Sequence, residues 1–384
     1  MNRIRGAVGA AAAFFTAACT SMPGEARQGG EPLVIAEQGQ FFVGGRYTTS
    51  KDGQIMTGQM FVQYQVPQNR RHPHPIVMWH GGGQTGTNFL GTPDGRKGWA
   101  QFFLEHGYAV YIVDQPARGR SGFFTPVYGE TRRPTTGAIS RRFTAPGNHN
   151  EYPQAKLHTQ WPGKGVPGDP VFDQFFASQV EDIREVSVIE RLNREAGMAL
   201  LDKIGAAILL THSQSGLFGW GIADARPGLV KGIVAVEPNG PPFYENKPIG
   251  PPDWFKDGAL DRPWGITRGP LTYSPPATSP KDLNMTREAA PGRPGLVRCW
   301  LQGAPARQLP NLQGIPILIV VSEASYHAPY DYCTSRYLTQ AGVKHDFVPL
   351  PDAGIRGNGH MMMLEKNNLE VAALLESWMR KNVR

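Results

Sequence analysis

Residues 205–220 decide the fold expected for this chain; they read Gly-Ala-Ala-Ile-Leu-Leu-Thr-His-Ser-Gln-Ser-Gly-Leu-Phe-Gly-Trp. The first six are small or apolar, which is typical of a strand buried on both faces. A polar turn follows at 211–216, and Leu217 and Trp220 then recur at helical spacing. A strand, a sharp turn carrying serine and a helix together lift a nucleophilic hydroxyl above a sheet.

Two serines compete for the role of nucleophile in this turn. The turn is crowded, so the positions two before and two after the nucleophile must be small. For Ser213 these positions are Thr211 and Ser215, whereas for Ser215 one of them is Leu217, which would collide with the strand. We therefore expect Ser213 to be the nucleophile and the backbone N–H of Gln214 to face a developing oxyanion.

A second motif follows another predicted strand, at 76–79. The strand runs directly into His80-Gly-Gly-Gly-Gln84. Consecutive glycines let bare backbone approach a substrate carbonyl and donate N–H groups to it. We expect Gly82, Gly83 and Gln214 to form an oxyanion hole.

Strands and helices alternate along most of the chain. This order predicts an α/β fold with a mostly parallel, doubly wound sheet whose reactive groups lie at the carboxyl ends of the strands. Besides the segments above, the pattern predicts a hairpin over 37–66, strands at 109–113, 232–236, 314–321 and 344–350, and helices at 99–106, 172–197, 330–341 and 361–381.

The expected base is a histidine that would take the serine proton and return it to the leaving group. His360 lies on a glycine-flanked loop after the last predicted strand. Its rivals are less well placed: His212 adjoins the nucleophile, His345 lies within a predicted strand, and His327 lacks such a loop. We therefore assign the base to His360.

The carboxylate that would orient His360 is harder to choose. Glu237 ends the strand after the serine turn, whereas Glu323 and Asp331 follow the next strand, and Asp352 is close to His360 in sequence. Spacing alone favours Glu237 and the pair Glu323/Asp331 equally.

No metal or organic cofactor is expected from the sequence. The pair His72 and His74 precedes a buried strand without a third ligand, which favours a surface turn.

Two long segments, about 122–170 and about 241–312, are rich in proline and carry few periodic signals. Loops of this length in a compact domain are usually functional or disordered. We expect both to form a lid over the carboxyl edge of the sheet, with Tyr152 and Trp161 lining an apolar entrance for the substrate.

Size and charge narrow the function further. The chain has 384 residues, enough for one large domain with insertions, which we place at 27–384. The net charge is +7, but no dense basic stretch is interleaved with aromatics, so no nucleic-acid partner is expected. Arg132-Arg133 and Arg141-Arg142 are expected to be solvated loop charges.

Residues 1–26 are expected to direct export. Arg3 and Arg5 precede an apolar run, 6–18, that is too short to span a bilayer. Thr16-Ala-Ala-Cys19 resembles a lipobox, which would lipidate Cys19 and attach the protein to a membrane. The alternative is plain signal cleavage. We therefore expect a periplasmic protein or an outer-membrane-anchored lipoprotein.

Cysteine usage is compatible with export. Apart from Cys19, only Cys299 and Cys333 are present. In an oxidising compartment they can pair, and the alternative is two separate buried thiols.

Four runs carry a resemblance to a known family: His80-Gly-Gly-Gly-Gln-Thr-Gly86, His212-Ser-Gln-Ser-Gly216, Glu237-Pro-Asn239 and Gly359-His-Met-Met-Met-Leu-Glu-Lys-Asn-Asn368. The chain resembles, over about 37–380, a small group of exported bacterial serine carboxylesterases of the α/β-hydrolase superfamily, which includes esterases that de-esterify sulfonylurea herbicides. The order Ser, acid, His is that of the superfamily. The resemblance implies Glu237 as the acid, long loops over the site and a homodimer.

These expectations combine into one hypothesis. The protein is expected to hydrolyse small to medium carboxylic esters through a Ser213–His360–Glu237 triad and an acyl-enzyme. The first alternative is a lactonase, thioesterase or amidase on the same triad. The second is a hydrolase-fold lipoprotein that only binds a ligand.

Overall fold

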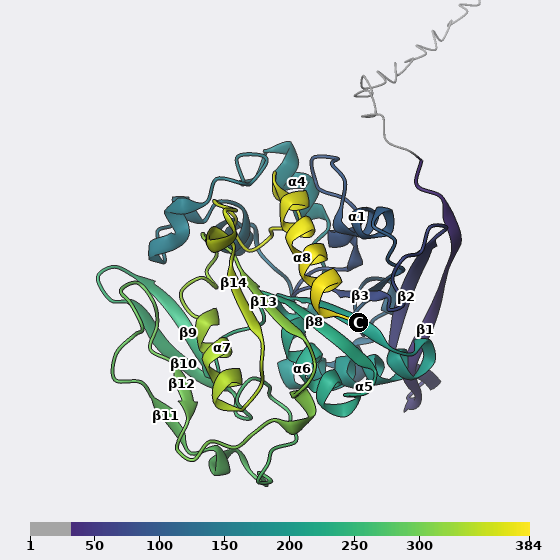
Figure 1. The fold of residues 1–384 in the computed structure, drawn as a ribbon. Coiled ribbons are helices and arrows are strands. Elements are labelled where there is room, and N and C mark those ends of the chain that lie inside the picture. The colour runs from purple at the N-terminus through teal and green to yellow at the C-terminus, as the bar shows by residue number, and fades with distance from the viewer. Residues whose placement is uncertain (1–31) are drawn as a thin grey trace, which may run out of the picture. The chain divides into compact units, whose positions relative to one another are not determined.

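A central sheet organises the protein (Figure 1). The computed structural model describes residues 32–384, and those from Val34 onward form one unit. The expected signal segment 1–26, with Cys19, lies outside the described residues. Within the described part of the chain, no helix is both long and apolar enough to cross a membrane.

The sheet has eight strands in the order β1-β2-β4-β3-β7-β8-β13-β14. The first three pair antiparallel and the others pair parallel. The predicted mostly parallel α/β sheet is therefore confirmed. Its strands are β1 (Ile35–Ser50), β2 (Gly53–Pro67), β3 (Ile76–Trp79), β4 (Val110–Asp114), β7 (Ala207–His212), β8 (Val230–Val236), β13 (Ile317–Val321) and β14 (Asp346–Pro349).

Three small two-stranded sheets lie outside the central one. Five of their six strands lie in the two long segments that have few periodic signals, 122–170 and 241–312. The sixth strand begins shortly after the first segment ends. Their strands are β5 (Thr131–Arg132) with β6 (Asp182–Ile183), β9 (Phe243–Gly250) with β10 (Trp254–Arg262), and β11 (Met285–Arg287) with β12 (Trp300–Gln302).

Helices pack around the central sheet, with α5 against α6 and α1 against α8 (Figure 1). The helices are α1 (Trp99–Glu105), α2 (Thr125–Tyr128), α3 (Thr136–Ile139), α4 (Pro170–Ala177), α5 (Val186–Ile204), α6 (Gly216–Ala225), α7 (Asp331–Gln340) and α8 (Asn368–Asn382).

The strands at the centre of the sheet are buried along their whole length. Every residue of β3, β7 and β13 is buried, because parallel strands are covered on both faces and each side chain must leave water. Strands β1 and β2 at the edge instead mix buried and exposed positions. The candidate site residues follow the carboxyl ends of buried strands, since Gly81 follows β3, Ser213 follows β7 and Glu237 follows β8.

The single helix predicted over 172–197 is wrong. The chain forms α4, then the short strand β6, then α5. The break occurs where Asp182 leaves helical geometry to meet Arg118 at 2.8 Å and Arg132 at 2.7 Å. These partners come from distant parts of the sequence, so helical periodicity could not reveal them.

The end of that predicted helix is also wrong. Gly197 lies inside α5, where a Cβ atom would stand 2.3 Å from Ile222 Cδ1 on α6. The glycine therefore allows two helices to approach, and the helix ends instead at Gly205, whose φ is +82°.

A disulfide joins Cys299 to Cys333, with a Cα–Cα distance of 5.3 Å. It ties the segment before β12 to α7. Both cysteines are fully buried, beside Val297 and Tyr330.

Candidate active site

The turn after β7 holds Ser213 in an unusual backbone conformation. Its φ is +54°, a left-handed value that few residues other than glycine adopt. The Ser213 carbonyl accepts a hydrogen bond from Asn239 N at 2.9 Å. The next turn is equally tight, because a Cβ atom at Gly216 would lie 2.5 Å from Pro238 Cβ. A strained turn at a reactive residue is the geometry expected for a nucleophile elbow.

The two candidate serines have different surroundings. Ser215 is fully buried, and its hydroxyl proton is shared between the carbonyls of Trp79 (2.8 Å) and His212 (2.9 Å). Its hydroxyl therefore fastens the elbow to β3. Ser213 is only partly buried, so its hydroxyl is the one that a substrate can reach.

The structure brings Glu237 and His360 together. Glu237 directly follows β8, and its Oε2 lies 2.5 Å from His360 Nδ1. The carboxylate also accepts hydrogen bonds from Ser322 N at 2.8 Å and from Ser325 Oγ at 2.7 Å. Glu237 is thus fully engaged, with Oε2 directed at Nδ1 on the edge of the imidazole.

The loop that carries His360 is held by a second buried carboxylate. Glu365 Oε1 accepts from Gly359 N at 2.9 Å, and Oε2 accepts from Asn358 Nδ2 at 2.8 Å. His158, from the 122–170 segment, lies 2.6 Å from the same carboxylate. These contacts fix the backbone on both sides of the ring.

The other acids considered for this role are occupied elsewhere. Asp331 faces His327 Nδ1 at 3.0 Å, and Glu323 accepts from Gly357 N at 2.9 Å. Asp352 is exposed. Among the acids weighed from the sequence, Glu237 is the one that contacts His360.

Tyr326 lies beside His360. Its hydroxyl is 3.4 Å from His360 Nε2, and the Ser213 side chain is among the groups that lower its pKa against the larger effect of burial. Among the described residues there is no direct hydrogen bond from Ser213 to His360. Catalytic hydrogen bonds are often long or absent without substrate and form in the complex. Sequence reasoning missed Tyr326, because this residue follows a strand end without a motif of its own.

Burial dominates the electrostatics of these groups. It lowers the pKa of His360 well below its usual value, and the nearby His327 and Arg142 act in the same direction. It also raises the pKa of Glu237, although the donors around that carboxylate oppose the rise. Burial raises the pKa of Tyr326 to about 12. A neutral imidazole and a protonated phenol therefore face Ser213 at neutral pH.

The glycine run after β3 lies against the elbow. A Cβ atom at Gly81 would be 3.1 Å from Ser213 Cβ, and one at Gly82 would be 3.7 Å from the side-chain amide of Gln214. Any side chain at Gly81 would therefore crowd Ser213. Gly83 turns away with a φ of +69°, and its neighbour is Pro134. Gly81 and Gly82 thus lie closer to the elbow than Gly83, which the sequence had included in the oxyanion hole.

A buried arginine links this glycine run to the serine elbow, and sequence reasoning missed it. Arg118 is 3% exposed, and its guanidinium donates to Gly81 O at 3.0 Å and to Gln214 Oε1 at 2.8 Å. Asp182 balances its charge at 2.8 Å. The sequence signal was weak, because Arg118 lies in a loop after β4 that carries no recognised motif.

The expected entrance residues are corrected by the structure. Tyr152 and Trp161 are 1% and 6% exposed, so neither lines an opening to solvent. Tyr152 donates to Ala324 O at 3.2 Å, and Trp161 packs on Phe175. These two aromatic residues therefore form the inner packing of the long loop and do not line a substrate entrance.

A different part of the same segment reaches the site. Phe143 stacks on His360 with ring centroids 5.2 Å apart, and Arg142 lies over the Tyr326 ring at 5.6 Å. Arg142 had been expected to be a solvated loop charge. It is exposed, yet it lies over an aromatic ring of the site.

A second histidine–carboxylate pair lies beside the first. The His327 ring stacks on His360 with centroids 4.6 Å apart, and burial lowers the His327 pKa to about 4. Glu237, His327 and His360 also place donor atoms within 4.8 Å of one another, a spacing that could hold a metal ion. The Glu237 oxygens are already used by serine donors and by His360, so the arrangement fits a hydrogen-bonded dyad better than a metal site.

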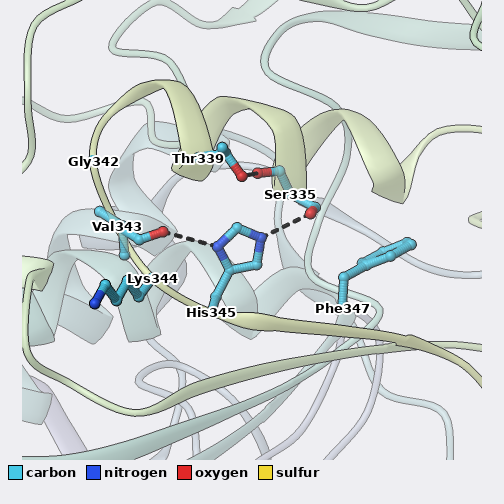
Figure 2. Close-up of a pocket in the computed structure, with 7 residues that line it drawn as sticks. All are labelled: Ser335, Thr339, Gly342, Val343, Lys344, His345 and Phe347. Carbon is cyan, nitrogen blue, oxygen red and sulfur yellow. Dashed lines mark hydrogen bonds between the residues drawn. The ribbon is translucent and has the colours of Figure 1, made fainter.

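The surface hollow in Figure 2 lies away from these groups, over α7 and the start of β14. It contains a serine–histidine pair, since Ser335 Oγ lies 2.7 Å from His345 Nε2. Ser335 is in the regular helix α7, with no strained turn at its position. The pair therefore lacks the backbone geometry that distinguishes Ser213.

An open-edged parallel sheet with a serine elbow, a histidine loop and a carboxylate at successive strand ends defines the architecture of a serine hydrolase. Comparison with known proteins agrees. Residues 76–374 match the alpha/beta hydrolase family, and the chain belongs to that family.

Two similar proteins span most of the chain. A protein from Fungal sp. (strain ATCC 74256), described as a probable secreted lipase, phiG, is 49% identical over 342 residues, which is 89% of each chain. The solved structure of a bacterial esterase superposes with a TM-score of 0.62 at 24% identity and covers 94% of this chain and 100% of its own. The similarity to this solved structure is a similarity of fold.

Proposed function

We propose that the protein is a serine carboxylesterase in which Ser213 is the nucleophile, His360 the general base and Glu237 the acid that orients it. The observation that carries the proposal is the 2.5 Å contact between His360 Nδ1 and Glu237, beside a serine with a φ of +54°. The relationship to a probable secreted lipase supports an ester as the substrate.

The reaction would begin when Ser213 Oγ attacks the ester carbonyl carbon while His360 Nε2 takes its proton. Glu237 stabilises the imidazolium that forms, because its carboxylate is buried and aimed at Nδ1. The tetrahedral intermediate then expels the alcohol, which receives the proton from His360. Water attacks the acyl-enzyme by the same route and releases the acid.

The oxyanion would be bound by backbone N–H groups. Gln214 N follows the nucleophile, and the glycine run supplies the other donor, with Gly82 nearer to the elbow than Gly83. One such donor contributes about 3 kcal/mol to the transition state. Arg118 supports this arrangement by holding Gly81 O and the Gln214 side chain.

The two long segments, 122–170 and 241–312, are proposed to cover the site. The support for the first is direct contact, because Phe143 stacks on His360 and His158 contacts the carboxylate that holds the His360 loop. The second contributes β9 to β12 and the disulfide cysteine Cys299.

The finer placement of the protein is also a proposal. Its motifs resemble the exported bacterial carboxylesterases that include the sulfonylurea-herbicide esterases, whereas the sequence relative above is fungal. Export is supported by that relative's description as secreted and by the disulfide, since disulfides persist in oxidising compartments. Lipidation of Cys19, a periplasmic location and a homodimer rest on the sequence alone.

The proposal is tested by Ser213→Ala, with Ser335→Ala as a matched control that also removes a serine beside a histidine. Turnover of 4-nitrophenyl butyrate should fall to background in the first variant and remain at the wild-type rate in the second, with equal melting temperatures. A fluorophosphonate probe should label wild type and Ser335→Ala only. Retained activity in Ser213→Ala, or no labelling of wild type, would overturn the assignment.

A matched panel then separates the proposed activity from its relatives. The panel consists of an ester, a thioester, an amide and a lactone of the same acyl chain length. All four should be cleaved, and the open-chain ester should have the highest kcat/KM. A higher kcat/KM for any of the others would replace carboxylesterase with that activity.

A further inference from the structure

Arg142 is a cation beside the proposed catalytic groups that has no acid partner among the described residues. It lies in a single π-helical turn, Ser140–Thr144, of the covering segment. Its guanidinium stands over the Tyr326 ring, 5.6 Å from the centroid. Its charge also lowers the pKa of both Tyr326 and His360, so it acts electrostatically on the site.

Neighbouring arginines are neutralised, whereas Arg142 is not. Arg141 lies 3.2 Å from Glu151, and Arg132 lies 2.7 Å from Asp182. Within residues 32–384, Arg142 makes no ion pair within 4.0 Å and no side-chain hydrogen bond. An exposed guanidinium that packs on an aromatic face keeps its donors free for a planar anion such as a carboxylate.

The position of Arg142 also indicates which part of an ester it would meet. The leaving alcohol receives its proton from His360 Nε2, so the alcohol oxygen must lie beside that atom. Tyr326 hydroxyl is 3.4 Å from Nε2 and therefore marks the alcohol side. The Arg142 guanidinium lies over the ring of the same tyrosine, so the alcohol portion of an ester bound there would extend toward it.

We propose that Arg142 forms a subsite for esters whose alcohol portion carries a carboxylate; this rests on the proposed esterase function. The carboxylate pairs with the guanidinium while the ester carbonyl meets Ser213. The site therefore selects anionic esters by attraction at the leaving-group side, and neutral esters are cleaved without this contribution.

The test uses two esters of nearly equal shape, 4-carboxyphenyl butyrate and 4-carbamoylphenyl butyrate. Each kcat/KM is divided by the rate of hydroxide-catalysed hydrolysis of the same ester, which removes the difference in leaving-group reactivity. The wild-type enzyme should prefer the anionic ester by about fivefold, the size expected for one partly exposed ion pair. Arg142→Gln should abolish the preference, and added salt should weaken it in wild type.

Two variants control for other causes. Arg142→Lys keeps the charge and should retain a preference in the same direction. Arg141→Gln removes a charge from the same turn, and because that arginine is already paired with Glu151, the preference should not change. A preference that survives in Arg142→Gln, or is absent in wild type, would overturn the subsite.

The two proposals fail in different ways. If wild type cleaves neither ester, or if Ser213→Ala cleaves both, the esterase assignment is wrong and the subsite falls with it. If the neutral ester is cleaved in a Ser213-dependent manner but without a preference for the anionic ester, the subsite alone is wrong.

Discussion

At the scale of single residues, the tyrosine beside the proposed base leads to a specific expectation. Tyr326 has a pKa raised to about 12, so its hydroxyl remains a donor in the working pH range. It lies 3.4 Å from His360 Nε2, where the leaving oxygen must be protonated. Tyr326→Phe should therefore reduce kcat/KM about tenfold for an alkyl ester, the effect of one lost hydrogen bond, and much less for a 4-nitrophenyl ester, whose leaving group needs little help.

The measurement for Tyr326→Phe is the ratio of kcat/KM values for ethyl and 4-nitrophenyl esters of butyric acid. A simple packing role would lower both values equally, because misplacing His360 harms every substrate, and an equal loss would refute the donor role. The phenylalanine ring should still pack beneath Arg142, so any preference for the anionic ester should persist.

Arg118 and Gly81 show why parts of the site escaped sequence reasoning. A buried guanidinium that joins a carbonyl on one loop to a side chain on the elbow depends on contacts across 37 and 96 positions. No local spacing records such contacts. That Ser213 and His360 would lie at the same edge of the sheet could be expected from strand ends and a glycine-flanked loop, because the strand ends of a parallel sheet converge. Spacing left Glu237 and the pair Glu323/Asp331 equally favoured, and it was the family resemblance that implied Glu237.

At the scale of elements, buried strands were easier to predict than helices and loops. Continuous apolar runs such as 76–79 and 317–321 leave little choice, because only a strand covered on both faces buries them all. The helix predicted over 172–197 failed where Asp182 is recruited by Arg118 and Arg132. A tertiary ion pair there outweighed a favourable helical pattern.

The disulfide is the second feature at this scale. Cys299 and Cys333 are 34 positions apart, and closing a loop of that length stabilises a protein by about 4 kcal/mol in the chain-entropy account. The double variant Cys299→Ala/Cys333→Ala should lose a free energy of unfolding of up to that size, measured by urea denaturation. The sequence alone left pairing and separate thiols equally open, since pairing depends on distance in space.

Reductant supplies the control for the disulfide prediction. Dithiothreitol should lower the urea midpoint of the wild-type protein toward that of the double variant and should leave the variant unchanged. Equal midpoints for wild type and variant under oxidising conditions would show that the bond contributes little. A shift of the variant with dithiothreitol would show that the reagent acts elsewhere.

At the scale of the whole molecule, four buried histidines make stability depend on pH. Burial lowers the pKa of His80 and His327 from 6.5 to about 4 and lowers those of His212 and His360 well below 6.5. Below pH 6.5 the unfolded chain binds protons at these positions that the folded chain does not bind. Unfolding is therefore favoured as pH falls, with a contribution of about 3 kcal/mol for each of His80 and His327 once the pH reaches their folded values.

Three buried acids oppose this effect but do not reverse it. Burial raises the pKa of Asp331, Glu237 and Glu190, so the folded chain can hold up to three protons that the unfolded chain has lost. Four histidines against three acids leave the unfolded state with more bound protons between about pH 4.5 and about pH 6. The free energy of unfolding, measured in urea, should therefore fall from about pH 6 to about pH 4.5. His80→Gln, which removes a buried histidine that does not contact the triad, should make this fall shallower, and a free energy of unfolding that is level or rises on acidification would refute the account.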